Sequence, residues 1–296
     1  MIIEEVAEKV YRLETPISGT DAVFAVYLIK ESGGALIEPG PSAAVPSIRE
    51  VIGQLEMKEL TYIIPTHIHV DHAGGTGTLA QIFPDARVIV HPAGMKHVVD
   101  PSRLIESTKN ALGPNFEDIF GSISPVPKSR IKTPDDGEII SLNSRDLQII
   151  YAPGHAPHHI VIFDKRTKGL FCGEALGIPG GGNELIPLPA VAPPSFDQEL
   201  YLETMEKLRK LGADILFYSH GGIGREPDTL ISIAAENTRA IGDIILDALK
   251  RGEVVESIGR KVGQYTKSRF GLELSDFDQA MMVGAHALYF TKKGLV

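Results

Sequence analysis

The chain is poor in cysteine and in positive charge. Cys172 is the only cysteine among the 296 residues, which excludes an internal disulfide and a cysteine-rich zinc site. Its 29 Lys and Arg residues stand against 38 Asp and Glu residues, and the formal net charge is -9. This balance argues against a nucleic-acid partner, because phosphate backbones are bound mainly by clustered Lys and Arg side chains.

The sequence also predicts neither a leader nor a membrane segment. The first residues, MIIEEVAEKVYRLETP, contain no basic stretch followed by an apolar one. No later run approaches the roughly 20 apolar residues that are needed to cross a bilayer. We therefore expect a cytoplasmic protein without a membrane partner, and the chain is long enough to bury a stable core without disulfides.

Residues 1–225 alternate apolar runs with segments of helical spacing. The runs are short and rich in β-branched residues, which indicates strands. The strands are expected at 23–30, 34–38, 61–65, 87–90, 138–142, 147–151, 159–164, 168–173 and 214–218. Helices are expected at 44–56, 72–83 and 196–211. This order predicts an α/β (α+β) fold in which two mixed sheets pack face to face with helices on the outer faces.

From Pro227 onward the pattern changes to amphipathic helices. Apolar residues recur at helical spacing near 228–250, 254–267 and 275–292, without further strand signals. We therefore predict a main domain over residues 1–225 and a C-terminal helical appendage over 226–296. Three roles fit this appendage: a structural cap, a homodimer surface, or a lid over the active site.

Four potential metal ligands lie within six residues of the segment I63-I-P-T-H-I-H-V-D-H-A-G-G75. His67 and His69 are two residues apart, so they project to the same side of an extended chain and can bind one ion. Asp71 and His72 follow at a turn, where they can face a second ion. Packing alone does not explain such a cluster, and the sequence predicts a metal site made of imidazoles and carboxylates.

This segment resembles the HxHxDH signature of the metallo-β-lactamase superfamily, which includes glyoxalase II thioesterases, lactonases, phosphodiesterases, RNA nucleases and sulfur dioxygenases. The resemblance covers residues 1 to about 225. It implies a four-layer αββα sandwich with two metal ions at one edge, and it implies three further ligands at the ends of later strands.

Each further ligand has a candidate in this sequence. The segment Y151-A-P-G-H-A-P-H-H159 resembles the family's PGHTPGH, which makes His155 a ligand, and Y218-S-H-G-G222 supplies His220. Glu174 stands where the family usually has an Asp that bridges both metals. It is one methylene longer, so it can still bridge if the strand end lies further back, whereas a monodentate or looser contact would change the metal spacing. The resemblance thus assigns His67, His69 and His155 to one ion and Asp71, His72 and His220 to the other, with Glu174 between them.

Four more residues are candidates for supporting or pocket roles. His159 matches the second His of the family segment and is expected to fix the loop behind the ligands. His158 is a candidate pocket residue, with simple surface exposure as the alternative. His286 and Tyr289 share one face of a predicted C-terminal helix; a lid could aim them at the metals, whereas ordinary helix packing also explains them.

The resemblance implies a hydrolase that acts on a small-molecule substrate. Two divalent ions, zinc by family analogy with iron or manganese as alternatives, would lower the pKa of a bridging water from about 15.7 toward 7. The metal-bridged hydroxide would attack an ester, thioester, lactone or phosphoester, and Asp71 would be the catalytic residue that orients it.

Two other classes of protein remain open. Sulfur dioxygenases use this scaffold with a single iron, so a mononuclear iron oxidoreductase is the first alternative. The second is a metal-containing binding or signalling protein whose helical appendage occludes the site. Metal analysis and a substrate panel distinguish these classes.

Residues 177–194 have no periodic pattern but are rich in Pro, Gly and apolar residues. Such a composition suits a partly rigid loop that lines a substrate pocket. A surface connection packed on the C-terminal helices explains it equally well.

Overall fold

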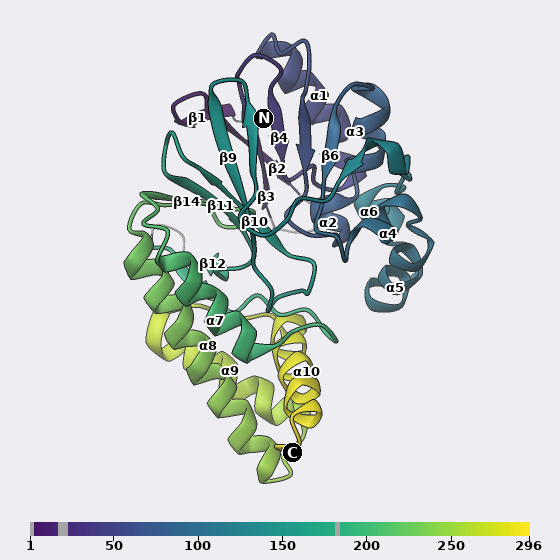
Figure 1. Ribbon diagram of the computed structural model, residues 1–296. Helices are drawn as coiled ribbons and strands as arrows, with labels where there is room; N and C mark the ends of the chain where they lie inside the picture. Colours follow the sequence, from purple (N-terminus) through teal and green to yellow (C-terminus); the bar gives the residue numbers. More distant parts are fainter. Residues whose placement is uncertain (1–2, 17–22, 181–183) are drawn as a thin grey trace. The chain divides into compact units, whose positions relative to one another are not determined.

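The computed structural model describes residues 3–16, 23–180 and 184–296, and the chain forms two compact units (Figure 1). The first unit consists of Met1–Tyr151, His158–Gly173 and Ala213–Ile223. The second unit consists of Ala152–Pro157, Glu174–Gly212 and Gly224–Val296.

The first unit contains a seven-stranded mixed sheet, whose strands follow one another in chain order. They are β1 (Ile3–Ala7), β2 (Val10–Pro16), β3 (Val23–Ile29), β4 (Ala35–Ile37), β5 (Tyr62–Ile64), β6 (Arg87–Ile89) and β7 (Ile131–Lys132). Strands β1 to β4 pair antiparallel, and β4 to β7 pair parallel. The parallel strands therefore end at the same edge of the sheet, where the chain places Glu38 and the segment that follows Ile64.

A second, six-stranded sheet has the order β15-β14-β11-β10-β9-β8. Its strands are β8 (Ile139–Leu142), β9 (Arg145–Tyr151), β10 (Ile160–Asp164), β11 (Gly169–Gly173), β14 (Ile215–Tyr218) and β15 (Ile223–Gly224). Strand β14 pairs parallel with β11, whereas β8 to β11 form antiparallel pairs. Side chains of both sheets form one buried cluster that includes Ile37, Ile64, Ile149 and Phe171. The two sheets thus pack face to face, as the sequence predicts.

Strand β3 shows why the apolar runs of the first unit are continuous. Phe24, Val26 and Leu28 belong to a helix-side core, whereas Tyr27 and Ile29 belong to the core between the sheets. Successive side chains of a strand point to opposite faces, so a strand that is covered on both faces needs apolar residues at every position.

Two helices contribute to the helix-side core of the seven-stranded sheet. Helix α1 (Val45–Gln54) contributes Ile48 and Val51, and α3 (Thr76–Ile82) contributes Leu79. The other helical segments of the first unit are η1 (Ser42–Ala44), α2 (Val70–Ala73), α4 (Met95–Val99), α5 (Ser102–Leu112), α6 (Phe116–Phe120) and η2 (Lys128–Arg130).

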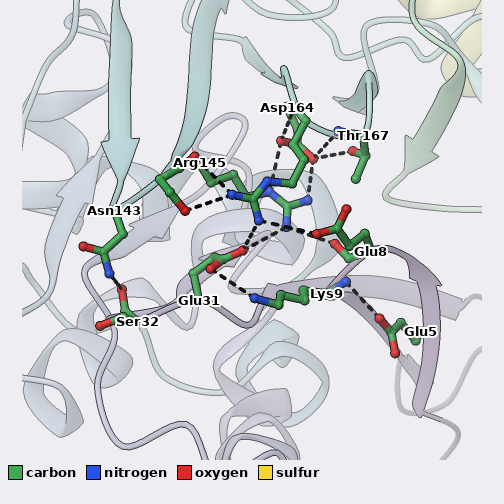
Figure 2. A network of polar contacts seen from close by, with 11 residues as sticks. Glu5, Glu8, Lys9, Glu31, Ser32, Asn143, Arg145, Asp164 and Thr167 are labelled. Atoms are coloured by element: carbon green, nitrogen blue, oxygen red, sulfur yellow. Dashed lines mark hydrogen bonds and ion pairs between the residues drawn. The ribbon is translucent and has the colours of Figure 1, made fainter.

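A buried ion-pair network lies where β9 begins and β10 ends (Figure 2). Arg145 is fully buried, and its Nε and Nη2 donate to the two carboxylate oxygens of Asp164 at 3.0 and 2.5 Å. Its Nη1 donates to the Glu8 carbonyl at 2.9 Å and lies 3.8 Å from Glu31 Oε1. Arg166 also donates to Glu31, at 2.6 Å. We call these five residues the arginine network; it holds β9, β10 and the turn after β3 together.

In its described residues, the second unit is built on four helices and one hairpin. The helices are α7 (Gln198–Arg209), α8 (Pro227–Lys250), α9 (Val255–Phe270) and α10 (Asp276–Lys292), and the hairpin consists of β12 (Ile178–Gly180) and β13 (Ile186–Leu188). Caps fix the helix ends: Asp197 accepts from Leu200 N, Ser275 accepts from Asp278 N, and Gly271 ends α9 in the left-handed conformation. Asn237 of α8 donates to the Pro187 carbonyl at 3.0 Å, which attaches the hairpin to the helices.

The expected fold class, a mixed α/β protein with C-terminal helices, is confirmed, and each predicted strand is present within two residues of its expected bounds. The single helix expected over 72–83 is wrong, because Gly74 and Gly75 separate α2 from α3. The prediction also missed β1 and β2, whose exposed faces carry charged residues, and the hairpin within 177–194, of which residues 181–183 lie outside the described residues. Among the described residues, no helix has the length and apolarity to span a membrane.

Candidate metal centre

The segment after β5 carries the first two histidines. Strand β5 ends at Ile64, and α2 begins at Val70, directly after an extended His69. His67 is buried, and its Nε2 lies 2.8 Å from Nδ1 of His69. The structure thus brings together the two imidazoles that the HxH spacing predicts to converge.

Asp71, His72 and His220 form a second group within the first unit. Each offers a ligand atom, and these atoms lie within 4.8 Å of one another. Asp71 Oδ2 is 3.4 Å from His72 Nε2 and 3.5 Å from His220 Nε2. His220 follows β14, the parallel partner of β11, so its place results from the pairing of two distant segments.

Glu38 is a buried carboxylate behind this group, and the sequence reasoning missed it. It follows β4 with a φ of 60° and is 1% exposed. Its Oε1 accepts hydrogen bonds from Thr66 Oγ1 at 2.7 Å and from Ser219 Oγ at 2.5 Å, and lies 3.2 Å from His72 Nδ1. The sequence gives only a weak indication of this role: Glu38 is an acidic residue at the end of an otherwise apolar run, directly before Pro39.

These contacts determine which imidazole nitrogens present lone pairs. Because Thr66 Oγ1 donates its proton to Glu38, it can accept from His67 Nδ1, which lies 3.1 Å away. His72 Nδ1 lies 3.2 Å from Glu38 Oε1. If each ring is neutral with its proton on Nδ1, Nε2 presents its lone pair, which is the form that binds a metal ion. Glu38 thus orients one histidine of each group.

The electrostatics around His72 favour positive charge. Its complete burial disfavours the imidazolium and would lower the pKa, but the carboxylates of Asp71 and Glu38 outweigh burial and raise the pKa of His72 well above its usual range. The surroundings of this ring therefore stabilise a cation next to Asp71.

The second unit holds His155 and Glu174 as a pair. His155 Nε2 is 2.8 Å from Glu174 Oε2. His155 Nδ1 donates to the Ala190 carbonyl at 3.1 Å, so Nε2 carries the lone pair in the neutral ring. Tyr201 Oη donates to the Glu174 carbonyl at 2.7 Å and accepts from Ala190 N at 3.3 Å. Ala190 and Tyr201, neither of them predicted from the sequence, thus hold this pair in place.

His159 and His158 lie beside the first histidine. The His159 ring is fully buried and stacks on His67 with centroids 4.9 Å apart, whereas the half-buried His158 ring lies 6.3 Å from His67. Gly173 makes room for this stack, since a Cβ there would meet His159 Nε2 at 2.7 Å and Thr66 Oγ1 at 2.6 Å. The supporting role of His159 stays a prediction.

His286 and Tyr289 lie in the core of the second unit. His286 is fully buried, packs against Phe196 with ring centroids 5.0 Å apart, and donates from Nδ1 to the Met282 carbonyl at 2.7 Å. Burial lowers the pKa of His286 to about 4. Tyr289 is also buried, in the cluster that α8, α9 and α10 share. Helix packing therefore accounts for both residues within their own unit.

The donor set fits divalent metal ions. Imidazole Nε2 atoms and carboxylate oxygens are ligands that zinc, iron and manganese accept. The first unit supplies the pair His67 and His69 and the group of Asp71, His72 and His220, and the second unit supplies the pair His155 and Glu174. Glu38 orients His67, through Thr66, and His72, and the Ala190 carbonyl orients His155, as metal ligands require.

A two-sheet sandwich with histidines and carboxylates at its strand ends defines a protein of the α/β class with a candidate metal centre. The model of the metallo-beta-lactamase superfamily matches residues 19–220. The match spans more than half of the chain, which therefore belongs to this superfamily.

Individual relatives are similar to this chain over only part of its length. The metallo-beta-lactamase fold-containing protein ST1585 of Sulfurisphaera tokodaii is 28% identical over 170 residues, which are 56% of this chain and 62% of that protein. A hydroxyacylglutathione hydrolase of Francisella tularensis subsp. novicida is 27% identical over 181 residues, which are 61% of this chain and 57% of that enzyme. In both cases the match spans less than two thirds of the relative's own length.

A solved structure matches over nearly the whole chain. The metallo-beta-lactamase family protein TTHA1429 from Thermus thermophilus superposes with a TM-score of 0.73 and 21% identity, covering 97% of this chain and 94% of that one. At this identity the likeness shows the fold alone, and it includes the C-terminal helices.

Proposed function

We propose that the protein is a metal-dependent hydrolase that cleaves an ester, thioester, lactone or phosphoester bond in a small molecule. The observation that carries this proposal is the set of imidazoles whose Nε2 lone pairs are fixed by Glu38 and Ala190, next to the carboxylates of Asp71 and Glu174. Membership of a superfamily with hydrolase members, among them a hydroxyacylglutathione hydrolase, supports it.

Two ions, zinc in our proposal, would be held by seven side chains. His67, His69 and His155 would hold one ion, and Asp71, His72 and His220 the other, with Glu174 between them. The ions would supply Lewis-acid chemistry and lower the pKa of water toward 7. The assignment rests on the superfamily's signature, on the nitrogen tautomers and on the short distances within each unit.

The chain's own residues have separate tasks in this proposal. Asp71 is partly exposed and lies between two imidazoles, so its carboxylate can orient the attacking water and accept its proton. Glu38 keeps His67 and His72 in the ligating tautomer, and Ala190 does the same for His155. His159 packs behind His67 and restricts its ring.

The test combines metal content per chain with activity on thioester, lactone and phosphodiester substrates. We expect close to two zinc ions and turnover of one substrate class, and we expect Asp71→Asn to lose nearly all activity. His97→Ala is the matched control, because His97 lies on α4 and belongs to neither group of ligands. A single iron without hydrolysis would contradict the proposal and favour an oxidoreductase. Two bound ions without any turnover would favour a binding protein.

A further inference from the structure

The second unit contains an apolar pocket that the proposed metal chemistry does not use. Its volume is about 320 Å³, and it lies between the β12–β13 hairpin, the segment after β13, and the turn that joins α9 to α10. Such a volume is within the range of small-molecule sites, which begins at about 300 Å³.

Apolar side chains from three separate segments make the walls. Leu188 and Val191 come from β13 and the residues after it, Leu272 from the α9–α10 turn, and Met281 and Met282 from α10. Methionine side chains are flexible and polarizable, so they adapt to ligands of different shape. At the mouth, Phe277 also lines the pocket and remains 57% exposed. A large aromatic side chain at an apolar opening gives an incoming apolar group an immediate contact.

The charges at the mouth are acidic. Glu273 and Asp278 line the pocket, and among the described residues no basic side chain lines it. Glu273 is paired with Lys267 at 2.6 Å, whereas Asp278 accepts a hydrogen bond from the neutral Ser275 hydroxyl at 2.7 Å. A negative charge therefore remains at the mouth, and it disfavours an anionic ligand while a neutral or cationic one can enter.

We propose that this pocket binds the alkyl chain or aromatic ring of a neutral or cationic small molecule. The inference goes beyond the proposed hydrolase and does not depend on it, because none of the proposed metal ligands lines the pocket. The wall nevertheless adjoins the metal centre's support: Ala190, which accepts the hydrogen bond from His155, stands between the lining residues Pro189 and Val191.

The first test is a titration of the full chain with N-phenyl-1-naphthylamine, a neutral dye that fluoresces in apolar surroundings. We expect saturable binding of one dye per chain, with and without zinc. Decanol and decyltrimethylammonium should displace the dye, and decanoate should do so about fivefold less well, because of the charge at the mouth. Asp278→Asn should abolish this discrimination. Equal displacement by decanoate in the original chain would overturn the charge preference.

Two variants locate the binding site. Met281→Asp places a charge in the wall and should weaken dye binding at least tenfold, and Phe277→Asp should weaken it about fivefold while altering only an exposed side chain. Leu288→Asp is the matched control, since Leu288 is an exposed apolar residue of the same helix that does not line the pocket; it should bind dye normally.

Far-UV circular dichroism and sedimentation velocity accompany each titration. Unchanged dye binding in a folded Met281→Asp chain, or in Phe277→Asp, would overturn the proposal. It would also be overturned by a protein that binds no dye and sediments as a dimer that Phe277→Asp dissociates, because a second copy would then cover these side chains.

Discussion

The two ends of the sandwich in the first unit place buried charge in different ways. At one end, Arg145 is a cation that the chain itself supplies, and Asp164 binds it through two hydrogen bonds (Figure 2). At the other end, Glu38 and Asp71 surround His72, whose pKa they raise. The first end has a fixed internal partner for its carboxylates, whereas the second favours a cation that, in our proposal, comes from outside.

This difference separates the residues that stabilise the domain from the residues that, in our proposal, bind a metal ion. A fixed ion pair is always complete once the chain folds, so it can hold strands together but cannot exchange its cation. Imidazoles can bind and release an ion, because a neutral ring ligates through the lone pair of one nitrogen while its other nitrogen keeps a hydrogen-bond partner. We therefore expect changes at the arginine network to alter folding, and changes around Glu38 to alter metal binding.

The largest effect should follow replacement of the fixed cation. Arg145→Met removes the cation that pairs with the fully buried Asp164, and breaking a buried pair costs about 3–5 kcal/mol. The free energy of unfolding, measured with urea, should fall by this amount. Lys168→Met is the control at an exposed pair with Asp214 and should change it by less than about 1 kcal/mol. A drop for Arg145→Met as small as the control's would mean that the network does not hold the fold.

Removal of metal should produce the next effect. A ligand that binds only the folded state stabilises it by about 4 kcal/mol at 1,000 times its Kd, so chelation should lower the melting temperature and added zinc should restore it. If Arg145→Met folds, chelation should lower its stability by the same amount, since the two ends act independently. If chelation does not change the melting temperature of the unsubstituted chain, the proposal that a metal ion stabilises the folded protein is wrong.

Substitution of one glutamate at each end tests whether only one of the two ends supports metal binding. Glu38→Gln retains the size of the side chain but weakens the support of His67 and His72, and loss of such outer partners typically costs 10- to 100-fold in metal affinity. Glu31→Gln alters the arginine network instead and should leave zinc affinity unchanged. Competition with a chromophoric chelator measures both affinities, and equal losses in the two variants would abolish the distinction between the ends.

His286, which belongs to neither the arginine network nor the candidate metal centre, should make the stability of the protein depend on pH. Its pKa in the folded protein is about 4, below the ordinary 6.5, because burial disfavours the charged ring. The unfolded chain therefore binds this proton more readily, and stability present above pH 6.5 is lost as the pH falls toward 4. From pH 7 to pH 5 the loss due to this residue should be about 2 kcal/mol. His286→Leu should reduce the loss of unfolding free energy between pH 7 and pH 5 by that amount. If the curves of the variant and of the unsubstituted chain run parallel, burial of His286 does not cause this loss.

The residue pattern predicted the parts of the centre that are local in the chain, and the distant candidates His155, Glu174 and His220 came from the resemblance to the superfamily. His67, His69, Asp71 and His72 lie on one short segment, so their spacing alone brings them together. Glu38 was missed because its role depends on Thr66 and on Ser219, which lies 181 residues further along the chain. No short-range pattern records such a contact.

The prediction of strands was limited in the same way to patterns that are local in the chain. Strands buried on both faces were predicted because their apolar runs are continuous. Strand β1, with exposed Glu4 and Glu5, was not predicted. The hairpin of β12 and β13 was read as a loop because Pro179 and Pro187, which pair with each other, are residues that usually disfavour strands.

Tyr201 provides the smallest and most specific test. Its hydroxyl connects the Glu174 carbonyl to Ala190 N, and the Ala190 carbonyl holds His155. Tyr201→Phe keeps the buried ring and removes both hydrogen bonds of the hydroxyl, each worth about 1 kcal/mol. We expect a modest loss of stability and about a tenfold loss of zinc affinity. If only stability falls, Tyr201 serves the packing of the second unit alone, and orientation of the metal ligands rests with the Ala190 carbonyl.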